Sequence, residues 1–169
     1  KAPLELLGPL GCGFQTGAGG VMRSLACHKG STIAIFGGGP VGLAAVMGAV
    51  IQGCSTIILV EPMPARREVA LELGATHVID PSAGDLAESL RAIVPEGLDF
   101  VFDSSGVVSV IEAGFAALGS HGAIGEFLMD IIGDVGGGAA GAEIGVVAQD
   151  HPRALVRHRI GIEALFGQS

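Results

Sequence analysis

A glycine-rich turn between two apolar segments constrains the fold of this chain more than any other feature. The apolar run 33–36 leads into Gly37-Gly38-Gly39-Pro40-Val41-Gly42, and a second apolar run, 57–60, ends at Glu61. Gly37, Gly39 and Gly42 have the spacing G-x-G-x-x-G between an expected strand and an expected helix. An acidic residue at the end of the next strand completes a pattern that is typical of dinucleotide-binding sites.

Each of the three spaced glycines has its own physical task. Gly37 allows a tight turn, Gly39 lets the backbone approach a pyrophosphate, and Gly42 lets the following helix lie close to the strand. The first N–H groups of that helix have no partner within the helix and favour a phosphate. The residues expected at the phosphates are Gly37, Gly38, Gly39, Pro40, Val41 and Gly42.

The acid at Glu61 identifies the preferred cofactor. A carboxylate at this place would accept hydrogen bonds from both hydroxyls of an adenosine ribose, and it would repel a 2′-phosphate. The pattern therefore favours NAD over NADP. Because the chain holds 29 glycines in 169 residues, the glycine spacing alone would be weak evidence. The interpretation depends on the flanking strand, helix and acid.

Short apolar segments alternate with helical patterns along most of the chain. They predict an α/β fold, a doubly wound parallel sheet of the Rossmann type with about six strands and with helices on both faces. Residues 126–150 have no readable pattern. The expected strands are 32–36, 56–60, 76–79, 99–102, 123–125 and 159–162, and the expected helices include 40–52, 64–73, 86–93 and 107–118.

Composition limits the class of protein. The length predicts one domain over residues 1–169, in which residues 1–30 form a linking segment. A net charge of −8 with 9 Lys and Arg residues argues against a nucleic-acid surface, and no apolar stretch is long enough for a membrane helix. Three cysteines without a C-x-x-C pair favour a reducing, cytoplasmic setting, with Cys27 and Cys54 as core residues.

The expected helix 40–52 has no charged residue on any face. Such a helix should be buried all round. Part of that burial is expected from the sheet, and the remainder indicates a covering partner, either a further domain or another subunit. We therefore expect the intact protein to be a homo-oligomer.

Four segments together resemble a known family. They are Gly11-Cys12-Gly13-Phe14-Gln15-Thr16-Gly17, the glycine turn, Glu61, and Glu72-Leu73-Gly74-Ala75-Thr76-His77-Val78-Ile79. In order and spacing they are similar to the cofactor-binding half of zinc-dependent medium-chain alcohol dehydrogenases, and most similar to the aryl (benzyl) alcohol dehydrogenase branch. The resemblance covers about residues 10–125.

The resemblance implies roles for single residues. Cys12 matches a ligand of the catalytic zinc, Thr16 a residue near the nicotinamide, and Arg66 a basic residue beside the adenosine ribose. Ser104 and Ser105 match a loop that lines the cofactor. Gly125 matches backbone that meets the carboxamide of the nicotinamide.

The same resemblance implies a reaction. It is hydride transfer between NAD and a zinc-bound primary alcohol, with aryl alcohols as one candidate class, and the corresponding aldehyde as product. The family's catalytic domain is missing from this chain, so we expect the chain alone to be inactive. Two departures are visible: Glu61 stands where the family usually has Asp, and residues 125–128 differ from the family's turn.

Other interpretations remain open. The chain could be a non-catalytic NAD-binding sensor or an assembly module, or it could belong to a zinc-free NAD(P)H reductase of the same superfamily. A methyltransferase with a similar sheet is a weaker alternative, because it would need an acidic residue just before the first glycine, where this chain has Phe36. Without the resemblance, Cys12 would be interpreted as a packing residue.

Overall fold

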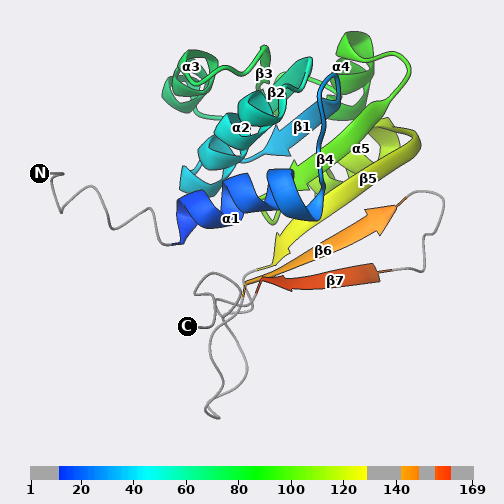
Figure 1. Cartoon of the computed structure of the whole chain (residues 1–169). Helices are drawn as coiled ribbons and strands as arrows, with labels where there is room; N and C mark the ends of the chain where they lie inside the picture. Colours follow the sequence, from blue (N-terminus) through cyan, green and yellow to red (C-terminus); the bar gives the residue numbers. More distant parts are fainter. Residues whose placement is uncertain (1–11, 129–141, 149–154, 161–169) are drawn as a thin grey trace, which may run out of the picture.

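A computed structural model describes residues 12–128, 142–148 and 155–160 of the chain. Thirteen elements follow one another in these ranges (Figure 1). They are α1 (Gly13–Gly19), the π-helix η3 (Gly20–Ser24), β1 (Thr32–Phe36), α2 (Pro40–Gln52), β2 (Thr56–Val60), α3 (Pro64–Glu72), β3 (His77–Ile79), α4 (Leu86–Ile93), β4 (Leu98–Asp103), α5 (Val108–Ala117), β5 (Leu118–Leu128), β6 (Ala142–Ala148) and β7 (Leu155–Ile160).

All seven strands form one sheet, in the order β3-β2-β1-β4-β5-β6-β7. The first five strands are parallel, with the order 3-2-1-4-5, and this confirms the predicted doubly wound α/β fold. The expectation of about six parallel strands needs correction, because β6 and β7 continue the sheet in antiparallel pairing. The strand expected at 159–162 overlaps β7 only at residues 159 and 160, and residues 161 and 162 lie outside the described ranges. β6 lies inside the stretch 126–150 that carried no pattern.

Two hydrophobic cores lie on opposite faces of the sheet. Successive side chains of a strand point to opposite faces, so one strand serves both cores. Ile33 and Ile35 of β1 belong to the core that α2 and α3 cover. Ala34 and Phe36 belong to the core that α4 and α5 cover. Helices therefore lie on both faces, as predicted for buried parallel strands.

Helix α1 covers much of the apolar helix α2. The two helices lie side by side in Figure 1, and a Cβ added at Gly17 would overlap the carbonyl oxygen of Val41 and lie 2.9 Å from the backbone nitrogen of Ala45. The covering partner expected for α2 is thus largely a helix of the same chain. Val50 and Ile51 stay exposed at the end of α2, by 45% and 67%.

This packing places α1 and η3 within the fold, although residues 1–30 were expected to be a linking segment; residues 1–11 lie outside the described ranges. None of the described helices combines the length and the hydrophobicity that crossing a membrane requires.

A polar clasp joins the amino ends of β1 and β4. The Asp99 carboxylate accepts hydrogen bonds from the Thr32 backbone N–H at 2.8 Å and from the Thr32 hydroxyl at 3.1 Å. The Thr32 hydroxyl in turn accepts from the Asp99 N–H at 2.9 Å. Because these hydrogen bonds form only when Thr32 lies beside Asp99, the clasp helps to set the register in which Ile33 pairs with Phe100.

Candidate functional site

The glycine turn joins β1 to α2 in the tight form that the sequence predicts. Gly37 has a φ of +93°, which an L side chain rarely adopts, and its N–H donates to the Val60 carbonyl at 2.9 Å. A Cβ on Gly42 would overlap the Gly37 carbonyl oxygen, whereas a Cβ on Gly39 would have no atom within 4 Å. The turn therefore packs α2 against β1 at Gly42 and leaves Gly39 open to space.

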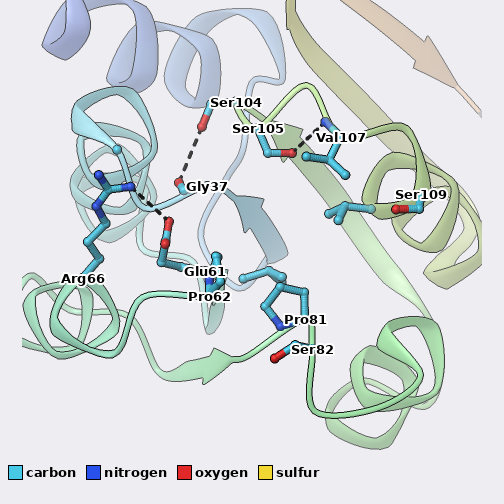
Figure 2. Close-up of a pocket in the computed structure, with 13 residues that line it drawn as sticks. Gly37, Glu61, Pro62, Arg66, Pro81, Ser82, Ser104, Ser105, Val107 and Ser109 are labelled. Atoms are coloured by element: carbon cyan, nitrogen blue, oxygen red, sulfur yellow. Dashed lines mark hydrogen bonds and ion pairs between the residues drawn. The ribbon is translucent and has the colours of Figure 1, made fainter.

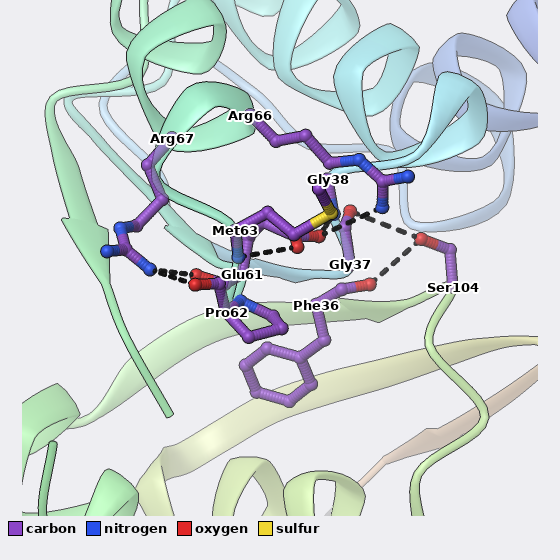
Figure 3. Close-up of polar contacts among 9 residues, drawn as sticks. All are labelled: Phe36, Gly37, Gly38, Glu61, Pro62, Met63, Arg66, Arg67 and Ser104. Carbon is purple, nitrogen blue, oxygen red and sulfur yellow. Dashed lines mark hydrogen bonds and ion pairs between the residues drawn. The ribbon is translucent and has the colours of Figure 1, made fainter. Parts of the chain in front are cut away.

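The Glu61 side chain folds back onto the glycine turn. Its residue lies just after β2 and is only 3% exposed. Figure 3 shows its carboxylate accepting hydrogen bonds from the Gly38 N–H at 2.6 Å and from the Met63 N–H at 2.9 Å. Arg66 places a guanidinium nitrogen 3.7 Å from the same carboxylate. A carboxylate offers about four acceptor positions. Acceptor capacity therefore remains for a ligand.

The loop after β4 forms the next wall. The Ser104 hydroxyl and backbone N–H both donate to the Phe36 carbonyl, at 2.8 and 2.9 Å, so the loop is tied to the end of β1 (Figure 3). Asp103 is 1% exposed and accepts from the Ser105 N–H at 3.0 Å, the Ser105 hydroxyl at 2.6 Å and the Gly106 N–H at 3.0 Å. The buried carboxylate of Asp103 thus shapes this loop. Our sequence analysis did not single it out.

Arg67 of α3 hydrogen-bonds to the segments that follow β2 and β3. One of its guanidinium nitrogens donates to the carbonyls of Glu61 and Pro62, each at 2.7 Å, and to the Asp80 carboxylate at 3.1 Å. Hydrogen bonds from the side chain and the backbone of Ser82, with a smaller contribution from Arg67, lower the pKa of Asp80. These contacts join the carboxyl ends of β2 and β3.

The turn, the acid and the loop surround one open pocket of about 590 Å³ (Figure 2). Six predicted cofactor residues line it: Gly37, Gly39, Glu61, Arg66, Ser104 and Ser105. Sequence reasoning missed the mainly apolar side of the pocket, which is lined by Val60, Pro62, Pro81, Ser82, Val107, Ser109 and Val110. The pocket lies at the carboxyl ends of parallel strands, where open α/β sheets bind their ligands.

The remaining predicted residues do not line the pocket. Gly38, Pro40, Val41 and Gly42 build the turn and the first turn of α2. Thr16 and Gly125 are buried, in α1 and β5.

Cys12 is exposed at the start of α1. Within ranges 12–128, 142–148 and 155–160, no three His, Cys, Asp or Glu side chains gather as metal ligands would. A catalytic zinc needs three protein ligands. The described residues by themselves therefore do not fit a zinc ion.

Known proteins that resemble this chain are zinc-binding and alcohol dehydrogenases. A family model described as "Zinc-binding dehydrogenase" matches residues 40–127. A probable alcohol dehydrogenase of Pseudomonas sp is 51% identical over 122 residues, which are 72% of this chain and 38% of that protein. A geraniol dehydrogenase of Castellaniella defragrans is 48% identical over 124 residues, or 73% of this chain and 33% of that protein.

Solved structures share the fold. The crystal structure of benzyl alcohol dehydrogenase from Acinetobacter calcoaceticus superposes with a TM-score of 0.73 at 38% identity, over 82% of this chain and 38% of that chain. This chain spans between about a third and two fifths of the length of these relatives.

Proposed function

Because this chain belongs to the zinc-binding dehydrogenase family, we propose that it serves as the NAD-binding domain of an alcohol dehydrogenase. One observation carries the proposal: the open face of Gly39 and the carboxylate of Glu61 meet at the same pocket. A dinucleotide needs a close backbone approach for its phosphates and an acceptor for its ribose, and these two residues supply them.

The proposed binding mode assigns a part of NAD to each wall of the pocket. The pyrophosphate lies against Gly39 and the amino end of α2, whose first N–H groups have no partner within the helix. The hydroxyls of the adenosine ribose donate hydrogen bonds to the Glu61 carboxylate, next to Arg66. The apolar side, with Pro62 and Pro81, borders the adenine. Ser104 and Ser105 line the path toward the nicotinamide, where Thr16 and Gly125 would complete the site.

Glu61 also determines the preference for NAD over NADP in this proposal. The residue is 3% exposed, so the charge of its carboxylate is poorly screened by water. A 2′-phosphate beside it would bring two like charges together. Arg66 lies 3.7 Å from the carboxylate and offsets only part of that repulsion.

The whole protein is proposed to oxidise primary alcohols, aryl alcohols among them, to aldehydes. NAD supplies the ring that accepts a hydride, and this chain holds and orients that ring. Cys12 would contribute one thiolate to a zinc site whose other ligands lie outside the described residues. We therefore expect the 169-residue chain alone to bind NAD without oxidising alcohol. The proposal also includes a cytoplasmic, homo-oligomeric intact protein.

A fluorescence titration tests the proposal. NADH fluorescence should rise when the chain is added, and Glu61→Ser should weaken NADH binding by about 1–3 kcal/mol, or about 5- to 150-fold, because hydrogen bonds to a charged group are lost. NADPH should lose less. Glu72→Ser is the matched control, since it removes the same charge from the exposed end of α3 and should leave the NADH affinity unchanged.

Three results would contradict parts of the proposal. An unchanged NADH signal at millimolar wild-type chain would exclude the NAD site. Equal losses of NADH and NADPH in Glu61→Ser would exclude the role of Glu61 at the ribose. Clear oxidation of benzyl alcohol by the chain with NAD and zinc would show that its catalytic groups are complete.

A further inference from the structure

Two cysteines meet at the amino ends of β1 and β2, at the opposite end of these strands from the pocket. Cys27 precedes β1 and Cys54 precedes β2. Several hydrogen bonds join their segments, among them Gly30 N–H to the Gly53 carbonyl at 2.9 Å, Ser55 N–H to the Ser31 carbonyl at 2.9 Å, and the Gln52 amide to the Cys27 carbonyl at 2.5 Å. The sequence predicted that both cysteines are core residues, but it did not show that they lie close together.

The backbone around Cys27 is held in an unusual conformation. Ala26 has a φ of +50°, and in the described part of the chain it is the only non-glycine residue with a positive φ. The π-helix η3 ends two residues earlier. Such conformations cost free energy and persist only where the surroundings impose them, often at functional sites. Here they direct Cys27 into the core, where it is 1% exposed, next to the half-buried Cys54.

The two thiols differ both in exposure and in the direction in which their pKa values are shifted. Cys54 packs against the core cluster that contains Cys27, and a side-chain hydrogen bond between the two shifts their pKa values in opposite directions. That bond lowers the pKa of Cys54, although burial and the charge of Asp99 oppose the change. The same hydrogen bond and burial raise the pKa of Cys27. Cys54 is thus both the more accessible and the more acidic of the two.

We propose that Cys27 and Cys54 form a reactive dithiol, a modification site that small-molecule disulfides convert into an intramolecular disulfide. The Cys54 thiolate attacks one sulfur of the reagent, forms a mixed disulfide and releases one thiolate. The Cys27 sulfur then attacks the Cys54 sulfur, gives its proton to the released thiolate, and expels the second reagent thiolate. The two cysteines lose two electrons together, and the reagent gains them as two thiols.

The resulting bond would close the segment 27–54, which contains β1, the glycine turn and α2. Because the dithiol and the pocket lie at opposite ends of β1 and β2, the oxidised chain should bind NADH with the affinity of the reduced chain. The dithiol is therefore independent of the proposed cofactor site, and each can fail without the other.

Oxidised glutathione is the probe for the test. The full 169-residue chain is incubated with it, quenched with acid, and analysed by intact mass and peptide mapping. We expect a product that has lost two hydrogen atoms and in which the Cys27 peptide is linked to the Cys54 peptide. Cys12→Ser, which removes the exposed third thiol, is the control and should give the same link.

Two further variants follow the order of attack. Cys27→Ser should stop at a glutathione adduct on Cys54, and Cys54→Ser should react at least about tenfold more slowly at Cys27, because a buried thiol of raised pKa is a poor nucleophile. A lasting glutathione adduct on wild-type Cys54, a link through Cys12, or Cys54 that stays unmodified while Cys12 reacts would each overturn the proposal. If a variant fails to fold, the mapping of the wild-type chain still decides between these results.

Discussion

Two alanine substitutions in the glycine turn should separate stability from cofactor binding. In Gly42→Ala the new Cβ would overlap the Gly37 carbonyl oxygen and lie 2.9 Å from its carbon. Ordinary Cβ contacts begin at 3.4 Å, so the contact with the carbon alone requires α2 to move from β1 by 0.5 Å, the difference between 3.4 and 2.9 Å, and the overlap with the oxygen requires a larger movement. In Gly39→Ala the new Cβ meets no atom within 4 Å.

The expected free energies differ accordingly. Gly42→Ala meets rigid backbone, which places it at the upper end of the overpacking range, about 3 kcal/mol. For a chain of this size the loss lowers Tm by about 6–12 °C. Gly39 is the N-cap of α2, where alanine costs at most about 1 kcal/mol, but its methyl group occupies the space that a pyrophosphate needs. We expect Gly39→Ala to bind NADH at least about tenfold more weakly.

Urea unfolding and NADH titration on the same samples check both expectations. Gly42→Ala should shift the urea midpoint, and Gly39→Ala should shift mainly the titration. A wild-type urea midpoint for Gly42→Ala would refute the close packing at this glycine. A wild-type NADH affinity for Gly39→Ala would refute the placement of the phosphates. The titration is made on folded protein, so a small loss of stability in this variant does not affect that conclusion.

Two other predictions concern carboxylates near the pocket. Asp103→Asn should lower the free energy of unfolding by about 1–3 kcal/mol in urea, because a charged acceptor of three hydrogen bonds is lost, and wild-type stability would contradict its role in shaping the loop. The pKa of Asp80 in the folded chain is held below its usual value of 3.8. The ionised Asp80 side chain therefore stabilises the fold above pH 3.8, and this stabilisation is lost as the pH falls through the lowered pKa. The urea midpoint of Asp80→Asn should therefore lie below that of the wild type near neutral pH and converge with it in acid; a difference that is constant with pH would contradict the assignment.

Local patterns predicted most of the parallel sheet. The expected bounds 32–36 and 56–60 coincide with β1 and β2, because these apolar runs between turn residues are too short for a helix and are rich in β-branched residues. β5 begins at Leu118, whereas its expected bounds were 123–125. Leu118 is followed by Gly-Ser-His-Gly, and the pairing of β5 with β4 shifts register between Leu98 and Phe100. β6 is rich in small residues and becomes a strand through its pairing with β5, which a local pattern does not contain.

Some residues of the candidate site could be predicted from the sequence, and others could not. The glycine turn and Glu61 were predicted because each follows a recognisable strand, and the loop at Ser104 was predicted from the family resemblance. The role of Asp103 could have been found from the run Asp-Ser-Ser-Gly, in which an aspartate commonly accepts from the backbone two residues on. The contact of Cys27 with Cys54 could not, because their proximity depends on the return of the chain through α2.

The clasp between Thr32 and Asp99 has a consequence for the order of folding. β1, α2 and β2 are close in sequence and can pair early, but β1 also needs β4, whose clasp residue is 67 positions away. Until that distant strand arrives, one flank of the central strand has no partner, and both hydrophobic layers that share it stay incomplete. We therefore expect the arrival of β4 to be the late, cooperative event, and a nascent chain that ends before it to be prone to self-association.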